Sequence, residues 1–158
     1  MKNLTKSVLI LILLITIGCG FKVVDNTNTN NFKIKEINTK GNSRINYKIK
    51  NYLLSNTKKI NENILSLDME VKLIKKVKEK NIKNEITKYE VILNTNISIF
   101  SIKKNKKNNF NLSVNGNYSV DAKNYSNTIN NEKNLINNLT DKIAKNILDK
   151  INKTVNDL

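Results

Sequence analysis

The stretch "LSLDMEVKL" (65–73) alternates apolar and polar residues along its whole length. Its apolar members are Leu65, Leu67, Met69, Val71 and Leu73. Successive side chains of a β-strand point to opposite faces, so this period of two predicts a strand with one buried and one solvated face.

Two later stretches carry the same period. They are "YEVILNTNISI" (89–99) and "FNLSVNGNYSV" (110–120). A polar residue at nearly every second position is typical of antiparallel strands that cover a core on one side only. Tyr118 falls in phase with the apolar set, so we expect it in the core.

Two segments show the period of a helix instead. Ile45, Ile49, Tyr52 and Leu53 predict an amphipathic helix of about three turns, which follows a turn and an N-cap at 41–43. A longer helix is predicted from Glu132 to about Val155, with Asn131 as its cap. Its apolar stripe is Leu135, Ile136, Leu139, Ile143, Ile147, Ile151 and Val155.

A short strand at 32–37 completes the order β-α-β-β-β-α. Two helices on one face of a four-stranded, mostly antiparallel sheet is the simplest way to bury both helical stripes. The sequence therefore predicts an α+β fold, with one domain over residues 32–158. The lysine-rich segments 75–85 and 103–109 are predicted to connect the strands.

The N-terminal segment predicts secretion. Lys2 and Lys6 precede the apolar run "VLILILLITI" (8–17), and the polar stretch "DNTNTNN" (25–31) follows soon after. The run is too short for a membrane-spanning helix, which needs about 20 residues, and fits a signal peptide. We therefore predict a signal peptide at 1–18 and a tether at 19–31.

Cys19, the chain's only cysteine, lies between Gly18 and Gly20 at the end of this run. The arrangement resembles the bacterial lipobox, although Thr16 stands where an aliphatic residue is usual. The resemblance implies cleavage between Gly18 and Cys19 and acylation of Cys19. Gly20, rather than Asp, favours sorting to the outer membrane. The alternative is a free cysteine in a signal or anchor helix.

Composition excludes several classes of site. The chain has no histidine and one cysteine, which leaves no zinc site, no Ser–His or Cys–His catalytic pair and no disulfide framework. The net charge is +15, but 27 lysines, 32 asparagines and a single arginine indicate a drift toward AT-rich codons. Nucleic-acid binding is disfavoured, because a secretion signal is present and aromatic residues do not interleave with the lysines.

The junction "GCGF" (18–21), the two strands at 89–99 and 110–120, and "LTDKIAKNILDKI" (139–151) together resemble the LptE (RlpB-like) family of outer-membrane lipoproteins. The resemblance implies a protein without enzymatic activity or cofactor. It implies a plug inside the LptD β-barrel that assists barrel assembly and lipopolysaccharide delivery to the outer leaflet. It also implies a fatty-acyl anchor, such as palmitate, on the periplasmic side of the outer membrane. The alternative is a periplasm-facing lipid-binding or adaptor lipoprotein without a barrel partner.

Lipid A carries phosphates, so a lipopolysaccharide contact needs clustered cations. The favoured cluster is Lys75, Lys76, Lys78, Lys80 and Lys83; the second is Lys103, Lys104, Lys106 and Lys107. In an antiparallel meander, the two clusters fall at opposite ends of the sheet. The alternative is that both are solvated turns. Asp68 and Glu70 share a strand face, where we expect them to aid solubility rather than catalysis.

Overall fold

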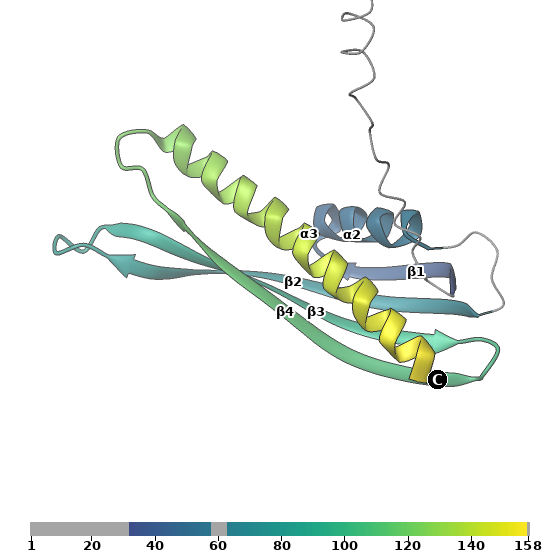
Figure 1. Ribbon diagram of the computed structural model, residues 1–158. Coiled ribbons are helices and arrows are strands. Elements are labelled where there is room, and N and C mark those ends of the chain that lie inside the picture. The colour runs from purple at the N-terminus through teal and green to yellow at the C-terminus, as the bar shows by residue number, and fades with distance from the viewer. Residues whose placement is uncertain (1–31, 58–62, 158) are drawn as a thin grey trace, which may run out of the picture.

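The computed structural model describes residues 32–57 and 63–157. The predicted signal peptide (1–18), the cleavage and lipidation site at Gly18 and Cys19, and the tether (19–31) lie outside the described residues. The elements are β1 (Lys33–Gly41), α2 (Ser43–Ser55), β2 (Ile64–Lys80), β3 (Ile86–Ser101), β4 (Lys106–Ser119) and α3 (Tyr125–Asp157), as labelled in Figure 1.

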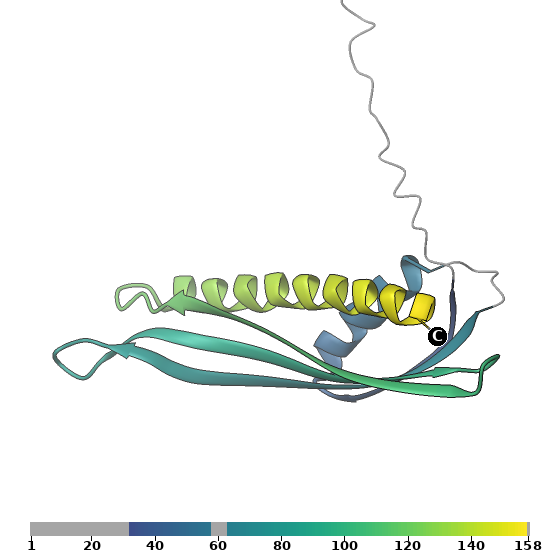
Figure 2. The same ribbon diagram turned by 60° about the horizontal axis from the view of Figure 1, so that its bottom comes forward.

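The four strands form one sheet in the order β1-β2-β3-β4. β1 runs parallel to β2, and β2, β3 and β4 form an antiparallel meander. A parallel pair needs a crossover connection, and α2 belongs to that connection. Both helices lie on one face of the sheet (Figures 1 and 2). The predicted α+β fold, with its order β-α-β-β-β-α, is confirmed.

The meander and α3 are unusually long. β2 has 17 residues and β3 has 16, whereas most strands have 3–10. At ~3.3 Å per residue β2 spans about 55 Å, and the 33 residues of α3 span about 50 Å. The helix therefore runs along most of the sheet's length, as Figure 2 shows.

The core lies between the sheet and the two helices. The alternating apolar residues of the strands point inward, and the helical stripes at Ile49 and Ile147 pack onto them. The largest of the almost completely buried side chains are Phe32, Ile49, Leu53, Leu65, Leu67, Leu93, Ile99, Ile143, Ile147, Ile151, Val71 and Val91. Tyr118, at 5% exposure, belongs to this core as predicted.

The prediction of a connection at 75–85 is wrong for most of its length. β2 continues to Lys80 and β3 begins at Ile86, so only 81–85 form the turn. The distal part of this hairpin extends past β1 and α2, and all of 74–80 is exposed. Where both faces of a strand meet water, the alternation that marks a half-buried strand is lost. The second predicted connection is likewise shorter, because β4 begins at Lys106.

The N-terminal ends of the two helices differ in how well the sequence predicts them. Asn42 caps α2, since its Oδ1 accepts from the Ile45 amide at 3.1 Å. For α3 the predicted start at Glu132 with Asn131 as cap is wrong, because the helix begins at Tyr125. Its first residues, "YSNTINN", are mostly polar, and the carboxylate of Asp121 accepts from the amides just before them. β1 also extends four residues past the predicted end, to Gly41.

Candidate functional site

The structure divides the predicted lysine cluster between different surfaces. Lys75 lies in phase with Leu73 on the helix-covered face of β2, and Lys76 is on the opposite face. Lys78 and Lys80 follow on the exposed end of the strand, and Lys83 lies in the turn. The five lysines thus belong to one hairpin but do not form one patch.

Lys75 is engaged with the long helix. Its Nζ lies 2.7 Å from Glu132 Oε2, and Tyr118 Oη donates to the same oxygen at 2.7 Å. The Lys75 ammonium also lies 4.4 Å from the ring centroid of Tyr89, within the range of a cation–π contact. The Tyr89 and Tyr118 rings stack with their centroids 5.6 Å apart. We call these four residues the polar bridge; it joins the three-stranded meander to α3.

The protonation equilibria of the polar bridge follow from this geometry. Partial burial opposes the charge of Lys75, but hydrogen bonding to Glu132 and Tyr118 outweighs it and raises the lysine pKa to about 12. Burial likewise opposes ionisation of Glu132, and the hydrogen bonds from Lys75 and Tyr118 still hold its pKa below the ordinary value. Burial, together with the Glu132 carboxylate, raises the pKa of Tyr118. Lys75 is therefore a structural cation, already neutralised by Glu132.

The hairpin turn is shaped by asparagines. Asn81 Oδ1 accepts from the amides of Lys83 and Glu85 at 2.9 and 3.0 Å, and Asn84 adopts a positive φ of 62°, a region that Asn tolerates better than most residues. Lys80 Nζ donates to Asn84 Oδ1 at 2.9 Å. Ile82 is fully exposed at the tip.

Three of the five predicted ligand residues remain available for an anion. Among the described residues, the side chains of Lys76, Lys78 and Lys83 have no ion-pair or hydrogen-bond partner. Lys75 and Lys80 do have partners. The second cluster, at 103–107, lies at the opposite end of the sheet in Figure 1, as predicted.

A groove between α2 and α3 was not anticipated from the sequence. It has a volume of about 420 Å³ and an apolar floor that includes Leu73, Ile129 and Ile136. Arg44, Lys48 and Lys133 line its rim. Arg44 is the chain's only arginine, which is the one sequence signal that could have drawn attention to this place.

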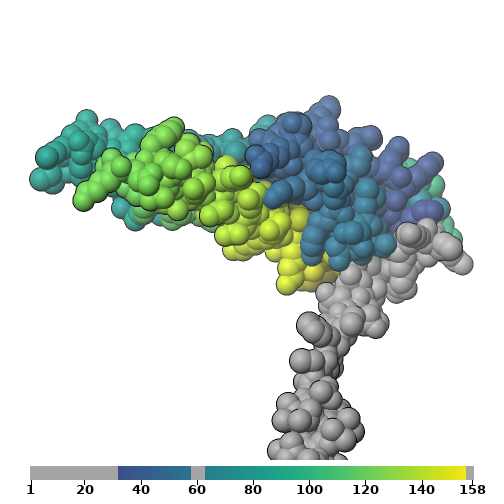
Figure 3. All heavy atoms as spheres, turned by 90° about the horizontal axis from the view of Figure 1, so that it is seen from above, coloured from purple at the N-terminus to yellow at the C-terminus, as the bar shows by residue number. Residues whose placement is uncertain are grey.

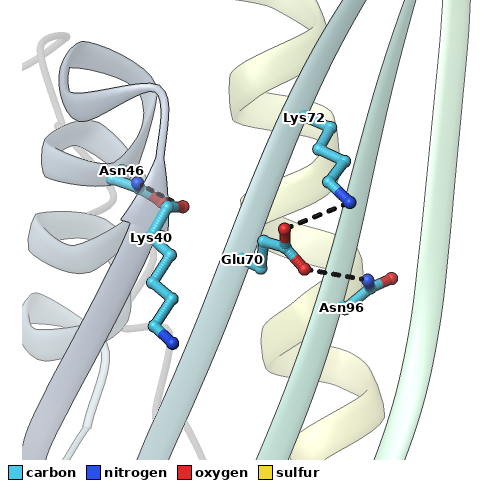
Figure 4. Close-up of polar contacts among 5 residues, drawn as sticks. All are labelled: Lys40, Asn46, Glu70, Lys72 and Asn96. Carbon is cyan, nitrogen blue, oxygen red and sulfur yellow. Dashed lines mark hydrogen bonds and ion pairs between the residues drawn. The ribbon is translucent and has the colours of Figure 1, made fainter.

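The face of the sheet opposite the helices carries mostly polar side chains, interrupted by the apolar pair Ile74 and Ile92 and by Phe100. Glu70 shows the arrangement: it lies 3.1 Å from Lys72 and accepts from Asn96 at 3.3 Å, as drawn in Figure 4. The hydrogen bond and charge of Lys72 lower the pKa of Glu70. A depression of about 710 Å³ lies on this face, bordered by Lys40, Asp68 and Asn109. Asp68 and Glu70 are thus part of a hydrogen-bonded surface.

The described part of the chain offers neither a metal site nor a membrane-spanning helix. In residues 32–57 and 63–157, no group of three or more His, Cys, Asp or Glu side chains could hold a metal ion. Within the same ranges, neither helix is apolar enough over a sufficient length to cross a membrane.

Comparison with known proteins gives matches in structure but none in sequence. No protein-family model and no curated protein sequence matches the chain. Rare lipoprotein B from Shewanella oneidensis superposes with a TM-score of 0.62 at 14% identity, over 77% of this chain and 97% of its own. An uncharacterized lipoprotein B from Nitrosomonas europaea gives 0.60 at 13% identity, over 87% and 94%.

A minor lipoprotein from Acinetobacter baumannii gives a TM-score of 0.58 at 15% identity, over 79% of this chain and 92% of its own. In each of the three superpositions, this chain matches nearly the whole length of the lipoprotein. The chain therefore has the fold of these bacterial lipoproteins.

Proposed function

We propose that this protein is a lipoprotein of the LptE type, anchored through Cys19 to the periplasmic side of the outer membrane. The observation that carries the proposal is the fold shared with three bacterial lipoproteins, one of them rare lipoprotein B, which is LptE. The sequence around Cys19 supports it independently, because a cysteine after a short apolar run is where such proteins receive their lipid.

Its partner, in this proposal, is an LptD-like β-barrel, in which the domain acts as a plug and assists assembly. The lumen of an outer-membrane barrel is polar. The uncovered face of the sheet suits such surroundings, because Asn, Ser, Asp and Glu side chains there hydrogen-bond to one another across neighbouring strands. The role is that of a binding and assembly protein without catalysis or cofactor.

Contact with lipopolysaccharide is assigned to the end of the β2–β3 hairpin. Lys76, Lys78 and Lys83 supply cations with no other polar partner among the described residues, and Ile82 supplies a fully exposed apolar side chain. Lipid A combines phosphates with acyl chains, so it needs both kinds of contact. We exclude Lys75 and Lys80 from this role because each is already engaged.

A second candidate is a periplasm-facing lipid-binding or adaptor lipoprotein without a barrel partner. The groove between α2 and α3 favours it, since an apolar floor beneath a basic rim fits an anionic lipid. The two candidates differ in whether a large β-barrel accompanies the protein.

The test is labelling and purification of the full-length chain and its Cys19→Ala variant from cells given an alkyne analogue of palmitate. We expect label on the wild-type protein only, recovery in outer-membrane fractions, and co-purification of a β-barrel identified by mass spectrometry. An unlabelled wild-type chain overturns the anchor. A labelled chain that purifies without a barrel, but with bound lipid, favours the second candidate.

Binding at the hairpin is tested separately with lipopolysaccharide. We expect the triple variant Lys76→Gln, Lys78→Gln, Lys83→Gln to bind at least tenfold more weakly than wild type. The matched control is the triple variant Lys103→Gln, Lys104→Gln, Lys106→Gln at the other end of the sheet. Equal loss in both triple variants would mean that net charge, and not the hairpin, determines binding.

A further inference from the structure

Among residues 32–57 and 63–157, no strand pairs with one edge of β2 over its distal half. β1 pairs with β2 only as far as Gly41, opposite Val71, and the chain then leaves the sheet at Asn42 to form α2. β3 continues along the other edge to Lys80. Within the described residues, the edge from Lys72 to Lys80 is therefore open, and Figure 1 shows β2 continuing well past the end of β1.

The backbone of this edge is arranged to receive a strand. The Val71 carbonyl accepts from the Asn42 amide at 3.3 Å, so it points toward the side on which β1 lies. Because backbone groups alternate between the two edges, Leu73, Lys75 and Val77 turn their N–H and C=O groups outward. The register stays regular to Val77, where a bulge begins. We call residues 72–77 the open edge.

An added strand would lie under the groove between α2 and α3. β1 sends Ile34 and Ile37 into the core beside β2. A strand placed in line with β1, farther along β2, would send its own alternate side chains toward Leu73, Ile129 and Ile136. These three side chains are apolar and are not fully buried. Figure 3 shows the teal β2–β3 hairpin extending beyond α2. Every second residue of the occupant must therefore be apolar.

The charges around the open edge select the other residues. Lys76, on the face of β2 opposite the groove, and Lys78 have no ion-pair or hydrogen-bond partner in the described part of the chain, whereas Arg44 and Lys133 line the groove itself. The nearby acids have partners of their own: Glu132 pairs with Lys75, Glu79 pairs with Lys88, and Glu90, which lies opposite Lys76 on β3, accepts a hydrogen bond from Asn115. Lysine on an edge strand discourages pairing with a second copy, because like charges would face each other. The acidic side chains of an added strand would instead be attracted to these lysines.

We propose that the open edge binds an extended segment of a partner protein in which apolar and acidic residues alternate. The segment adds to the sheet as a fifth strand, with backbone hydrogen bonds to Leu73, Lys75 and Val77 and apolar side chains in the groove. This interaction depends on neither the lipid anchor nor the barrel of the proposed function.

The test measures binding of a fluorescent ten-residue peptide, alternating Val and Glu, to the full-length chain in detergent. Two further peptides carry N-methyl groups, one on the valine amides and the other on the glutamate amides. We expect saturable binding of the parent peptide and at least tenfold weaker binding of one methylated peptide, since a strand pairs through one edge. Undiminished binding of both methylated peptides overturns the proposal, as does equal binding of a Val–Lys peptide.

A variant of the protein tests the same edge. Val77→Pro removes one outward N–H without removing a hydrogen bond between β2 and β3, and Val77→Thr keeps that N–H. We expect at least tenfold weaker binding for Val77→Pro and unchanged binding for Val77→Thr. Equal binding by both variants overturns the proposal. A dimer of the unliganded chain that Val77→Pro abolishes would assign the edge to a second copy, and would also overturn it.

Discussion

Gly41 at the end of β1 lies so close to the carbonyl oxygen of Val71 on β2 that no β carbon fits between them. The φ of Gly41 is +93°, a backbone conformation that residues other than glycine rarely adopt. This contact marks the point where β1 leaves the sheet and where the open edge begins.

Gly41→Ala should therefore destabilise the protein. A backbone atom cannot move aside, and the positive φ adds strain, so we expect the free energy of unfolding to fall by about 2–3 kcal/mol. Urea unfolding followed by circular dichroism measures it. The control is Gly116→Ala, where the new β carbon would lie 2.6 Å from Cδ1 of Leu135, the end of a flexible side chain. For Gly116→Ala we expect the free energy of unfolding to fall by only about 1 kcal/mol. A larger loss at Gly116 than at Gly41 would contradict the argument.

Removing the carboxylate of the polar bridge should weaken the attachment of α3 to the meander. In Glu132→Gln, Lys75 loses its ion pair at 2.7 Å. We expect the free energy of unfolding to fall by about 1 kcal/mol, since the pair is partly shielded from water. Glu79→Gln is the matched control because its bond to Lys88 lies at the exposed hairpin. Equal effects of the two substitutions would show that the bridge adds nothing beyond a surface pair.

The polar bridge also predicts how stability depends on pH. The Glu132 pKa is held below its ordinary value of 4.5, so its contribution is present above that pH and is lost as the pH falls through the folded-state pKa. The Lys75 pKa is raised from 10.5 to about 12, so its contribution is complete below 10.5 and is lost as the pH rises toward 12. Urea unfolding measures the free energy of unfolding of wild type and Glu132→Gln. The difference between the two free energies should be smaller at about pH 3 than at about pH 7. A difference that stays constant down to pH 3 would exclude this role for Glu132.

A core substitution tests the packing of α3 on the sheet. Ile147 is completely buried, and Ile147→Ala leaves a cavity that should lower the free energy of unfolding by about 2–5 kcal/mol. Leu54→Ala on α2 removes a side chain that is 42% exposed, and we expect a smaller loss. Thermal and urea unfolding of the two variants should rank them in this order. The reverse order would place Ile147 outside the core.

The candidate site was harder to predict than the fold. Each core strand and helix carries its own period, so Leu67, Leu93 and Ile143 could be assigned to the core from local sequence alone. The lysines of the hairpin carry no period, since most of that segment is exposed on both faces. The sequence therefore showed a group of cations, but it did not show that Lys75 would form an ion pair with Glu132, 57 positions away.

The start of α3 and the groove illustrate the same limit. Residues 125–131 are helical because Asp121 and Thr128 hydrogen-bond the chain entering the helix, whereas their polar composition resembles a loop. Arg44, on α2, lines the same groove as Lys133 only because the two helices lie on one face of the sheet. No spacing within either helix encodes that proximity.

The sequence by itself determined which segments are helix and strand, their order, and the side of each that is buried, because hydrophobic burial acts on the repeat of each element. Only the tertiary structure decided where the strands continue past the core and, for the residues it describes, which lysines lack a charged partner and which edge of β2 lacks a neighbouring strand. Those features depend on register and on contacts between distant segments, and neither leaves a local period in the chain.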